Sequence, residues 1–221
     1  MEMPEISSRQ PSTLKWRFSS YFRLKMDPAS IADVELVDAV TKEVTSFREV
    51  WKDQTCVIIF LRRFGWPFCR LAAKEISSLV PQLKQNNVRY GGYSPDRNIN
   101  QTFRLVGIGL ESIGLDEFLE GKYFDGDLFV DDKKTSYDKL GFQRMGLMEL
   151  LPSAMSRKWM EAGAKAFSMN LGGNIIQGDG YQKGGCLVVG KGGDPVLFSY
   201  VQQDAADHPD NQDILKALNL Q

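Results

Sequence analysis

The sequence has little of several residue types on which common kinds of active site depend. Among its 221 residues there is one histidine, His208, which argues against Ser-His-Asp catalysis and excludes any metal site that needs two histidines. Its three cysteines, Cys56, Cys69 and Cys186, are widely separated and odd in number. They do not form the pattern of a disulfide framework, so we expect a reducing, cytoplasmic (cytosolic) location and no bound metal.

Concentrated charge and long apolar segments are also missing. The formal net charge is -1, whereas a dedicated nucleic-acid-binding protein would usually be strongly basic. The longest apolar run, residues 56–61, is far too short to cross a bilayer, so we expect no stable membrane insertion. With 43% hydrophobic residues, a chain of this length can bury a core without covalent cross-links.

The first 25 residues differ from the rest, because they are rich in Ser, Arg and Lys and lack sustained apolar periodicity. They contain no apolar segment of signal-peptide length. Their basic and aromatic residues could also indicate a transit peptide or a membrane-touching segment, but Glu2 and Glu5 weaken the transit interpretation. We therefore expect a disordered N-terminal extension over residues 1–30 and one domain over residues 31–221.

From residue 34 onwards, patterns typical of strands and helices alternate. Residues 56–61 are a continuous apolar run rich in β-branched side chains, which predicts a central strand buried on both faces. Pro67 suits the first turn of a helix, and apolar residues then recur at helical spacing as far as Gln85. Further strands are predicted at residues 34–40, 88–90, 105–108, 128–130, 186–189 and 196–201. Further helices are predicted at residues 47–51, 115–119, 137–140, 147–165 and 210–218.

Two features complete the predicted organisation. Residues 90–104, which are mostly polar, are predicted to be a loop insertion that interrupts or precedes one strand. Residues 190–195, which are rich in glycine and end in proline, predict the turn of a hairpin. Strand–helix alternation followed by a late hairpin predicts an α/β fold, with a thioredoxin-like mixed sheet flanked by helices.

The turn between the central strand and the long helix holds the main candidate for chemistry, Cys69. If Trp66 caps the helix and Pro67 is its first residue, Cys69 lies in the first turn, where free N–H groups and the helix dipole favour a thiolate. Three arginines close in sequence could add to this positive field: Arg62, Arg63 and Arg70. The alternative is a buried packing cysteine, which is common for this residue, and the local pattern alone leaves both interpretations open.

The other notable patterns have simpler explanations. Cys56 and Cys186 begin apolar strands, so both are expected in the core. The glycine-dense residues 171–193 contain neither a phosphate-loop nor a dinucleotide-binding motif. We therefore attribute these glycines to turns and to tight backbone packing.

The strand-to-helix segment Phe60-Leu61-Arg62-Arg63-Phe64-Gly65-Trp66-Pro67-Phe68-Cys69-Arg70 resembles the peroxiredoxin-like 2 family. The resemblance is strongest to its prostamide/prostaglandin F synthase branch, and the selenoprotein U proteins are relatives. Similar stretches are residues 114–121, 137–142, 182–193 and 196–202, and the resemblance as a whole covers roughly residues 31–220. It implies a thioredoxin-like fold.

The resemblance also implies an oxidoreductase that reduces prostaglandin H2 and prostamide H2 to the F2α products. NADPH would be the electron source, acting indirectly through a thioredoxin-type reductant. The family site is a C-x-x-C pair, in which one thiolate attacks the O–O bond and the second sulfur resolves the adduct as a disulfide. Cys69 matches the second position, and Arg63 and Arg70 are expected to stabilise the thiolate. The alternatives are a general thiol or selenol peroxidase and a non-catalytic binding module.

The sequence departs from the family pattern at the first position of the pair, where it has Trp66. Three explanations are open: a degenerate relative, a protein in which Cys69 works alone with an external thiol, or a selenocysteine codon (UGA) translated as Trp. We favour the third, because tryptophan is an unusual replacement for a small exposed nucleophile, and a UGG codon would exclude it. Family chains begin near Met26 and lack residues 90–104, so both additional segments depart from the pattern as well.

Overall fold

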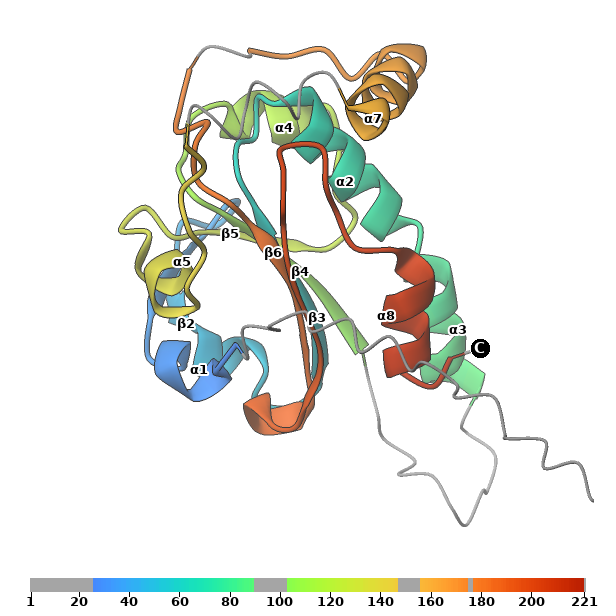
Figure 1. The fold of residues 1–221 in the computed structure, drawn as a ribbon. Coiled ribbons are helices and arrows are strands. Elements are labelled where there is room, and N and C mark those ends of the chain that lie inside the picture. Colours follow the sequence, from blue (N-terminus) through green and yellow to red (C-terminus); the bar gives the residue numbers. More distant parts are fainter. Residues whose placement is uncertain (1–25, 90–102, 147–155, 175–176, 221) are drawn as a thin grey trace, which may run out of the picture.

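The structure is a computed structural model that describes residues 26–89, 103–146, 156–174 and 177–220. Its strands are β1 (Glu35–Asp38), β2 (Val44–Ser46), β3 (Thr55–Leu61), β4 (Phe103–Gly109), β5 (Asp127–Val130), β6 (Gly185–Val189) and β7 (Val196–Val201). Its helices are η1 (Pro28–Ile31), α1 (Phe47–Val50), α2 (Pro67–Ser77), α3 (Val80–Arg89), α4 (Leu115–Glu120), α5 (Thr135–Lys139), α7 (Arg157–Ser168), η2 (Lys191–Gly193) and α8 (Asn211–Ala217). The strands form one sheet in the order β2-β1-β5-β4-β3-β6-β7 (Figure 1).

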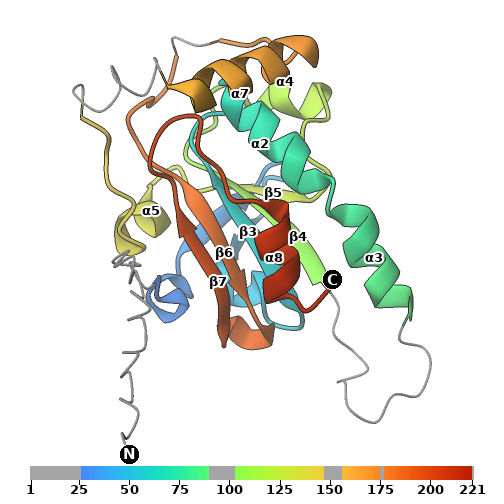
Figure 2. The same cartoon turned by 45° about the vertical axis from the view of Figure 1, so that its right-hand side comes forward.

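The central strand β3 is buried along its whole length. It runs parallel to β4 and antiparallel to β6, so the sheet is mixed. Because side chains alternate along a strand, Val57 and Ile59 pack in the core with α2 and α8, whereas Ile58 and Phe60 pack with η1, α1 and α5. Figure 1 and Figure 2 show α2 and α8 on one side of the sheet and α5 on the other. The predicted central strand and the predicted mixed sheet flanked by helices are both confirmed.

The long helix predicted over residues 67–85 is wrong in one respect, because it is two helices. α2 ends at Ser77, and α3 starts at Val80 and continues to Arg89. Pro81 explains the break: it has no N–H to bond the carbonyl of Ser77, but it fits the first turn of a new helix. The strand predicted at residues 88–90 is also wrong, because residues 88 and 89 end α3. A short apolar run does not distinguish a strand from a helix end.

The ends of the two unusual segments can be placed. Met26 is 1% exposed and lies in the core with η1, so residues 26–30 belong to the domain rather than to the extension expected over 1–30. Residues 1–25 lie outside the described residues. Phe103 and Arg104, which were counted in the insertion over 90–104, are the first residues of β4 and pair with Thr55 and Cys56 of β3. Residues 90–102 lie outside the described residues.

The remaining predicted elements agree with the structure to within a few residues, and the hairpin between β6 and β7 is present. The helix predicted at 147–165 is observed from Arg157, after the cap Ser156, whose hydroxyl accepts the N–H of Trp159. Residues 147–155 lie outside the described residues. Of the helices in the described part of the chain, none is long and apolar enough to cross a membrane.

Candidate active site

Residues 62–70, which join β3 to α2 and include the first turn of that helix, are here called the redox turn after the chemistry expected from the sequence. Trp66 is the extended cap residue of α2, Pro67 is its first helical residue, and Cys69 follows in the first turn. This agrees with the sequence prediction. In this position the first N–H groups of the helix have no intrahelical partner, so they and the helix dipole favour negative charge on the sulfur. Cys69 is a free cysteine and is only 4% exposed.

Arg62 is the arginine of the redox turn that lies in the electrostatic field of Cys69. Its side chain is 2% exposed and donates hydrogen bonds to the carbonyls of Gln182 (2.8 Å), Ala205 (3.0 Å) and Gly180 (2.5 Å). Burial lowers the pKa of Arg62, and negative charge on Cys69 opposes that shift. These partners are neutral carbonyls, so the guanidinium keeps a positive charge that a Cys69 thiolate could balance.

Arg63 contacts the cap residue of α2. Its guanidinium lies 5.5 Å from the centre of the Trp66 ring and donates to the carbonyl of Gln177. Its Nε is buried and has no hydrogen-bond partner among the described residues. The positive charge of Arg63 therefore lies next to the side chain at position 66. That Arg63 stabilises a thiolate stays a prediction.

Arg70 connects the redox turn to two other segments. Its Nε donates to the carbonyl of Phe64 at 2.9 Å, and its guanidinium lies 3.0 Å from Glu117 of α4 and 4.6 Å from the ring centre of Tyr123. It also donates to the carbonyl of Gly172. Because a carboxylate already compensates its charge, we expect Arg70 to fix the turn more than to act on the sulfur.

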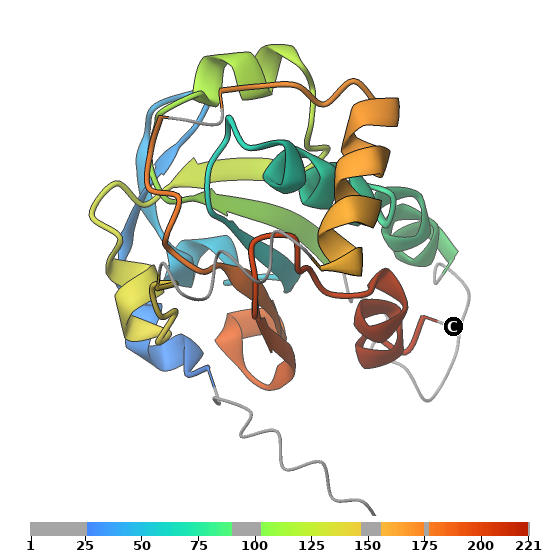
Figure 3. The same ribbon diagram turned by 45° about the horizontal axis from the view of Figure 1, so that its top comes forward.

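Position 66 lies in an aromatic cluster between α2 and α7. The Trp66 ring centre is 5.7 Å from that of Phe68 and 6.1 Å from that of Trp159, and Phe68 and Trp159 are 4.7 Å apart. α7 lies beside α2 at this end of the molecule (Figure 3). The indole N–H groups of Trp66 and Trp159 are buried without a hydrogen-bond partner among the described residues. The rings thus pack together while two of their hydrogen-bond donors stay unpaired there.

Tyr137 of α5 is a residue of this region that the sequence analysis missed. Its hydroxyl lies 2.6 Å from the carbonyl oxygen of Leu61 and 2.9 Å from that of Ile108, so it joins the ends of β3 and β4 beside the redox turn. Complete burial raises the pKa of Tyr137 well above its usual value, and the charges of Asp131 and Cys69 add to this. Tyr137 begins residues 137–142, one of the stretches similar to the family, and this similarity was a sequence signal that could have pointed to it.

The glycine-dense segment after α7 packs tightly against the redox turn. A side chain at Gly173 would meet the carbonyl oxygen of Gly65 at 2.5 Å, and one at Gly178, whose φ is +91°, would meet the Glu111 carboxylate at 2.0 Å. The predicted tight backbone packing is confirmed at Gly173, and the positive φ of Gly178 agrees with the predicted turns.

The other two cysteines lie in the core, as predicted. Cys56 and Cys186 are both 0% exposed, and burial raises the pKa of each to about 12. Both are free, and both lie in strands whose backbone groups are engaged in the sheet. Neither therefore has the surroundings of a reactive thiol.

The first turn of α2 does not fit the pyrophosphate of a dinucleotide. Such a site needs glycines that let backbone N–H groups approach the phosphates, whereas this turn has Trp66, Pro67 and Phe68. Pro67 also lacks the N–H itself.

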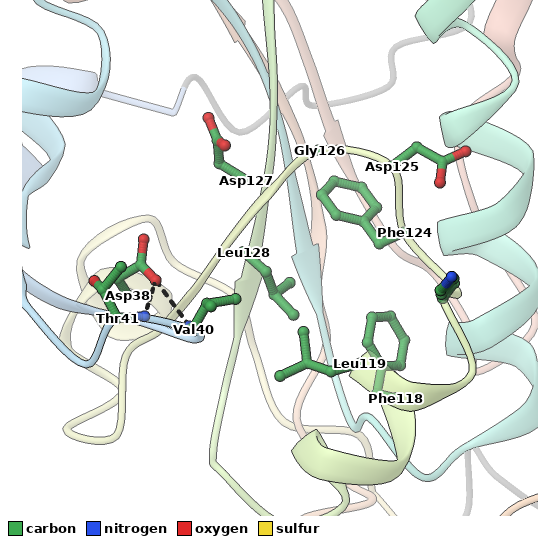
Figure 4. Close-up of a pocket in the computed structure, with 11 residues that line it drawn as sticks. Asp38, Val40, Thr41, Phe118, Leu119, Phe124, Asp125, Gly126, Asp127 and Leu128 are labelled. Carbon is green, nitrogen blue, oxygen red and sulfur yellow. Dashed lines mark hydrogen bonds between the residues drawn. The ribbon is translucent and has the colours of Figure 1, made fainter.

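A separate cavity of about 350 Å³ lies between the β1–β2 turn and the α4–β5 connection (Figure 4). Phe118, Phe124 and Leu128 face it, and Asp38 and Asp127 lie at its rim. Both carboxylates have structural roles: Asp38 accepts the N–H groups of two residues of its own turn, and Asp127 pairs with a neighbouring arginine at 2.5 Å. The cavity contains no cysteine, so it is not the redox site.

Solved structures similar to this one share its fold. A peroxidoxin, BcpB, from Mycobacterium tuberculosis matches 86% of this chain and 92% of its own, with a TM-score of 0.51 and 17% identity. A peroxiredoxin Q from Xanthomonas campestris matches 90% of this chain and 95% of its own, with a TM-score of 0.52 and 12% identity. The fold is therefore the thioredoxin-like fold of these peroxiredoxins.

Sequence comparison places the chain more closely. The family model for AhpC/TSA antioxidant enzymes matches residues 75–204. The "Prostamide/prostaglandin F synthase" of Sus scrofa is 41% identical over 193 residues, which cover 87% of this chain and 88% of that protein. The human protein of the same name is 39% identical over 195 residues, covering 88% and 90%. The chain belongs to the peroxiredoxin-like 2 family of AhpC/TSA antioxidant enzymes, as the resemblance in its sequence predicted.

The two kinds of match cover the redox turn differently. The family model begins at Glu75, six residues after Cys69, so it describes the scaffold and leaves out the turn. An alignment that spans 87% of the chain contains the turn as well. The similarity to the named synthases therefore extends to the region that holds Cys69.

Proposed function

We propose that this protein reduces the O–O bond of lipid endoperoxides, with prostaglandin H2 and prostamide H2 as substrates and the F2α compounds as products. The observation that carries the proposal is the position of Cys69 in the first turn of α2, where its charge also acts on the pKa of the buried Arg62. Relatives about 40% identical over most of the chain, named prostamide/prostaglandin F synthase, support the choice of substrate.

The proposed chemistry consumes two thiols and one endoperoxide. A thiolate attacks one oxygen, the O–O bond breaks, and the other oxygen leaves as an alkoxide that takes a proton to become an alcohol. A second thiol then attacks the sulfur of the S–O adduct, which releases the second alcohol and forms a disulfide. A thioredoxin-type dithiol, itself reduced at the expense of NADPH, restores the two thiols.

The residue at position 66 decides which sulfur begins the reaction. In a C-x-x-C or Sec-x-x-C site the first residue would attack and Cys69 would resolve. With Trp66, only Cys69 remains in the turn, and an external thiol must resolve the adduct. We propose that the natural residue 66 is selenocysteine and that the chain with Trp66 is impaired. The codon for residue 66 tests this, since UGG contradicts it and UGA supports it.

The activity is best tested with three chains: the written sequence, Trp66→Cys, and Trp66→Cys with Cys69→Ser. Each is assayed with prostaglandin H2 and with a small alkyl hydroperoxide, using NADPH, thioredoxin reductase and thioredoxin. We expect Trp66→Cys to exceed the written chain by about 100-fold, because it restores a nucleophile, and the double variant to lose turnover. Cys56→Ser in the Trp66→Cys background is the matched control and should keep the activity.

Two results would contradict the proposal. If Trp66→Cys gains nothing, position 66 is not the site of a lost nucleophile. If the hydroperoxide is reduced and prostaglandin H2 is not, the protein is a general thiol peroxidase. That second function is supported by the AhpC/TSA antioxidant enzyme family to which the chain belongs.

A further inference from the structure

The single histidine of the chain lies where three segments meet. His208 follows β7, and its Nε2 forms an ion pair with the Glu75 carboxylate of α2. Its Nδ1 lies 3.2 Å from the carbonyl oxygen of Ala206. The same Glu75 carboxylate also receives Lys165 of α7. One carboxylate thus joins α2, α7 and the segment that leads to α8.

The two contacts of the imidazole ring define its protonation state. Both partners, the Glu75 carboxylate and the Ala206 carbonyl, are hydrogen-bond acceptors. A neutral imidazole has one N–H and one lone pair, so it would satisfy one acceptor and repel the other. Only the doubly protonated ring of His208 donates to both. The geometry therefore calls for a positive charge at this residue.

The other charged groups around the ring are mostly paired. A cavity of about 270 Å³ at this junction is lined by charged residues of α2, α7 and the His208 segment, which are Glu75, Lys158, Glu161, Lys165, Asp207 and His208. Lys158 lies 3.4 Å from Asp207, and Glu161 lies 2.6 Å from Arg157. From α8, the uncharged Asn211 donates to the backbone carbonyl of Glu75 at 2.7 Å. Among the residues that the structure describes, His208 and Lys165 are the two whose side chains pair with the carboxylate of Glu75.

The pKa directions agree with this geometry. The hydrogen bond with Glu75 raises the pKa of His208, although desolvation acts in the opposite direction. Burial alone would raise the pKa of Glu75, but the hydrogen bonds from His208 and Lys165 outweigh it and lower that pKa. A raised histidine pKa in the folded protein means that the contact is complete at low pH and is lost as the pH rises through that pKa.

The cluster is connected to the redox turn through α7. α7 packs on α2 through a small apolar cluster that includes Leu71, Ala162, Ala166 and Ala206. Ala206 belongs to it through its side chain, while its carbonyl binds His208. Phe68 and Trp159 pack against this cluster, so the polar contacts of Glu75 add to an apolar contact between α7 and α2.

We propose that His208 is a pH-sensitive clasp: the doubly protonated ring holds the segment around residue 206 and α7 against α2, and loss of one proton loosens α7 from the redox turn. α7 covers that turn through the contacts of Trp159 with Trp66 and Phe68. The clasp would thus set how open the turn is. This consequence for activity rests on the proposed function, whereas the clasp itself does not.

Because the chain has one histidine, the titration can be followed without assignment, from the single imidazole Cε1–H signal in a proton NMR spectrum of the full chain. We expect a midpoint above the ordinary value of about 6.5, and a return towards it in Glu75→Gln. Asp213→Asn removes a carboxylate from an exposed ion pair of α8 and is the matched control, which should leave the midpoint unchanged. A wild-type midpoint at or below the ordinary value would overturn the proposal, as would a midpoint that Glu75→Gln leaves in place.

Amide hydrogen exchange, corrected for the intrinsic effect of pH, tests the link to α7. We expect protection of residues 157–168 to fall about tenfold from below to above the histidine midpoint, and to stay at the lower level throughout in His208→Gln. Protection of α7 that does not follow the midpoint would show that the ring titrates without controlling the helix. Both measurements are made without substrate, so a failure of the proposed reductase activity would not change them.

Discussion

The two ends of β3 offer a comparison between buried cysteines. Cys56 lies in the strand and is 0% exposed, and Cys69 lies just beyond the other end of the strand and is 4% exposed. At Cys56 the surrounding backbone is engaged in the sheet, and burial raises the pKa of the thiol to about 12. At Cys69 the helix start provides free N–H groups, and Arg62 provides a charge. The two buried thiols thus have different surroundings, and we expect the backbone and the charge around each of them, rather than burial alone, to decide its reactivity.

The comparison predicts a large difference in alkylation. In the native protein we expect iodoacetamide to modify Cys69 at least about 100-fold faster than Cys56 or Cys186, because only the thiolate reacts. Peptide mapping by mass spectrometry over a time course measures the three rates. Equal rates for the three cysteines would remove the distinction between the two ends of β3.

Replacement of Arg62 tests whether its charge contributes to the difference between Cys69 and Cys56. We expect Arg62→Met to slow alkylation of Cys69 about tenfold and to destabilise the fold by about 3 kcal/mol, because buried carbonyls lose their donor. Arg62→Lys keeps the charge and should restore part of the rate. Arg48→Met, which removes an exposed arginine far from the site, is the control and should have neither effect.

Replacement of the core cysteines tests the other side of the comparison. Cys186→Ala should lower the free energy of unfolding by about 1 kcal/mol, because it leaves a small void, while the activity of the Trp66→Cys chain stays unchanged. Urea denaturation and the peroxide assay measure the two quantities. A large loss of activity at unchanged stability would show that Cys186 takes part in the redox reaction.

The last prediction concerns the stability of the glycine-dense segment, whose backbone carbonyls accept hydrogen bonds from Arg62. Asp179 lies 2.5 Å from Arg144 and 3.1 Å from Lys134; burial alone would raise its pKa, but these partners lower it to about 2. A lowered pKa gives stability above the ordinary value near 4, which is lost as the pH falls towards 2. Asp179→Asn should therefore cost about 1 kcal/mol at pH 7 and nothing near pH 2. Thermal unfolding across this range measures it, and a cost that does not depend on pH would exclude the ion pairs as its cause.

The sequence was sufficient for features that depend on short-range patterns. Apolar runs and periodicity located β3, the start of α2 and the hairpin, and Pro67 placed Cys69 in the first helical turn. The break at Pro81 was visible in the sequence, but apolar spacing continues past it and outweighed it. Residues 88 and 89 carried too short a pattern to distinguish a helix end from a strand.

Contacts between side chains that lie far apart along the chain could not be predicted from the sequence. The family resemblance favoured Arg63 and Arg70 as the groups that stabilise the thiolate, and only the folded chain shows that Arg62 turns towards carbonyls of distant loops, whereas Arg70 meets Glu117. The contact of Tyr137 with the ends of two strands and the pairing of His208 with Glu75 also join residues far apart along the chain. Local propensity contains no information on such partners, because tertiary packing selects them.

The position of α8 has a consequence for how the chain folds during its synthesis on the ribosome. Ile214 and Leu215 are buried in the same core as Ala73 and Ile76 of α2, yet α8 is synthesised after every other described element. β3 contributes Val57 and Ile59 to this core before α8 is made, but until α8 emerges the part of the core that Ile214 and Leu215 cover stays open. A nascent chain that lacks α8 would expose this apolar surface to chaperones and to other chains, so the packing around α2 is completed only after α8 has been made.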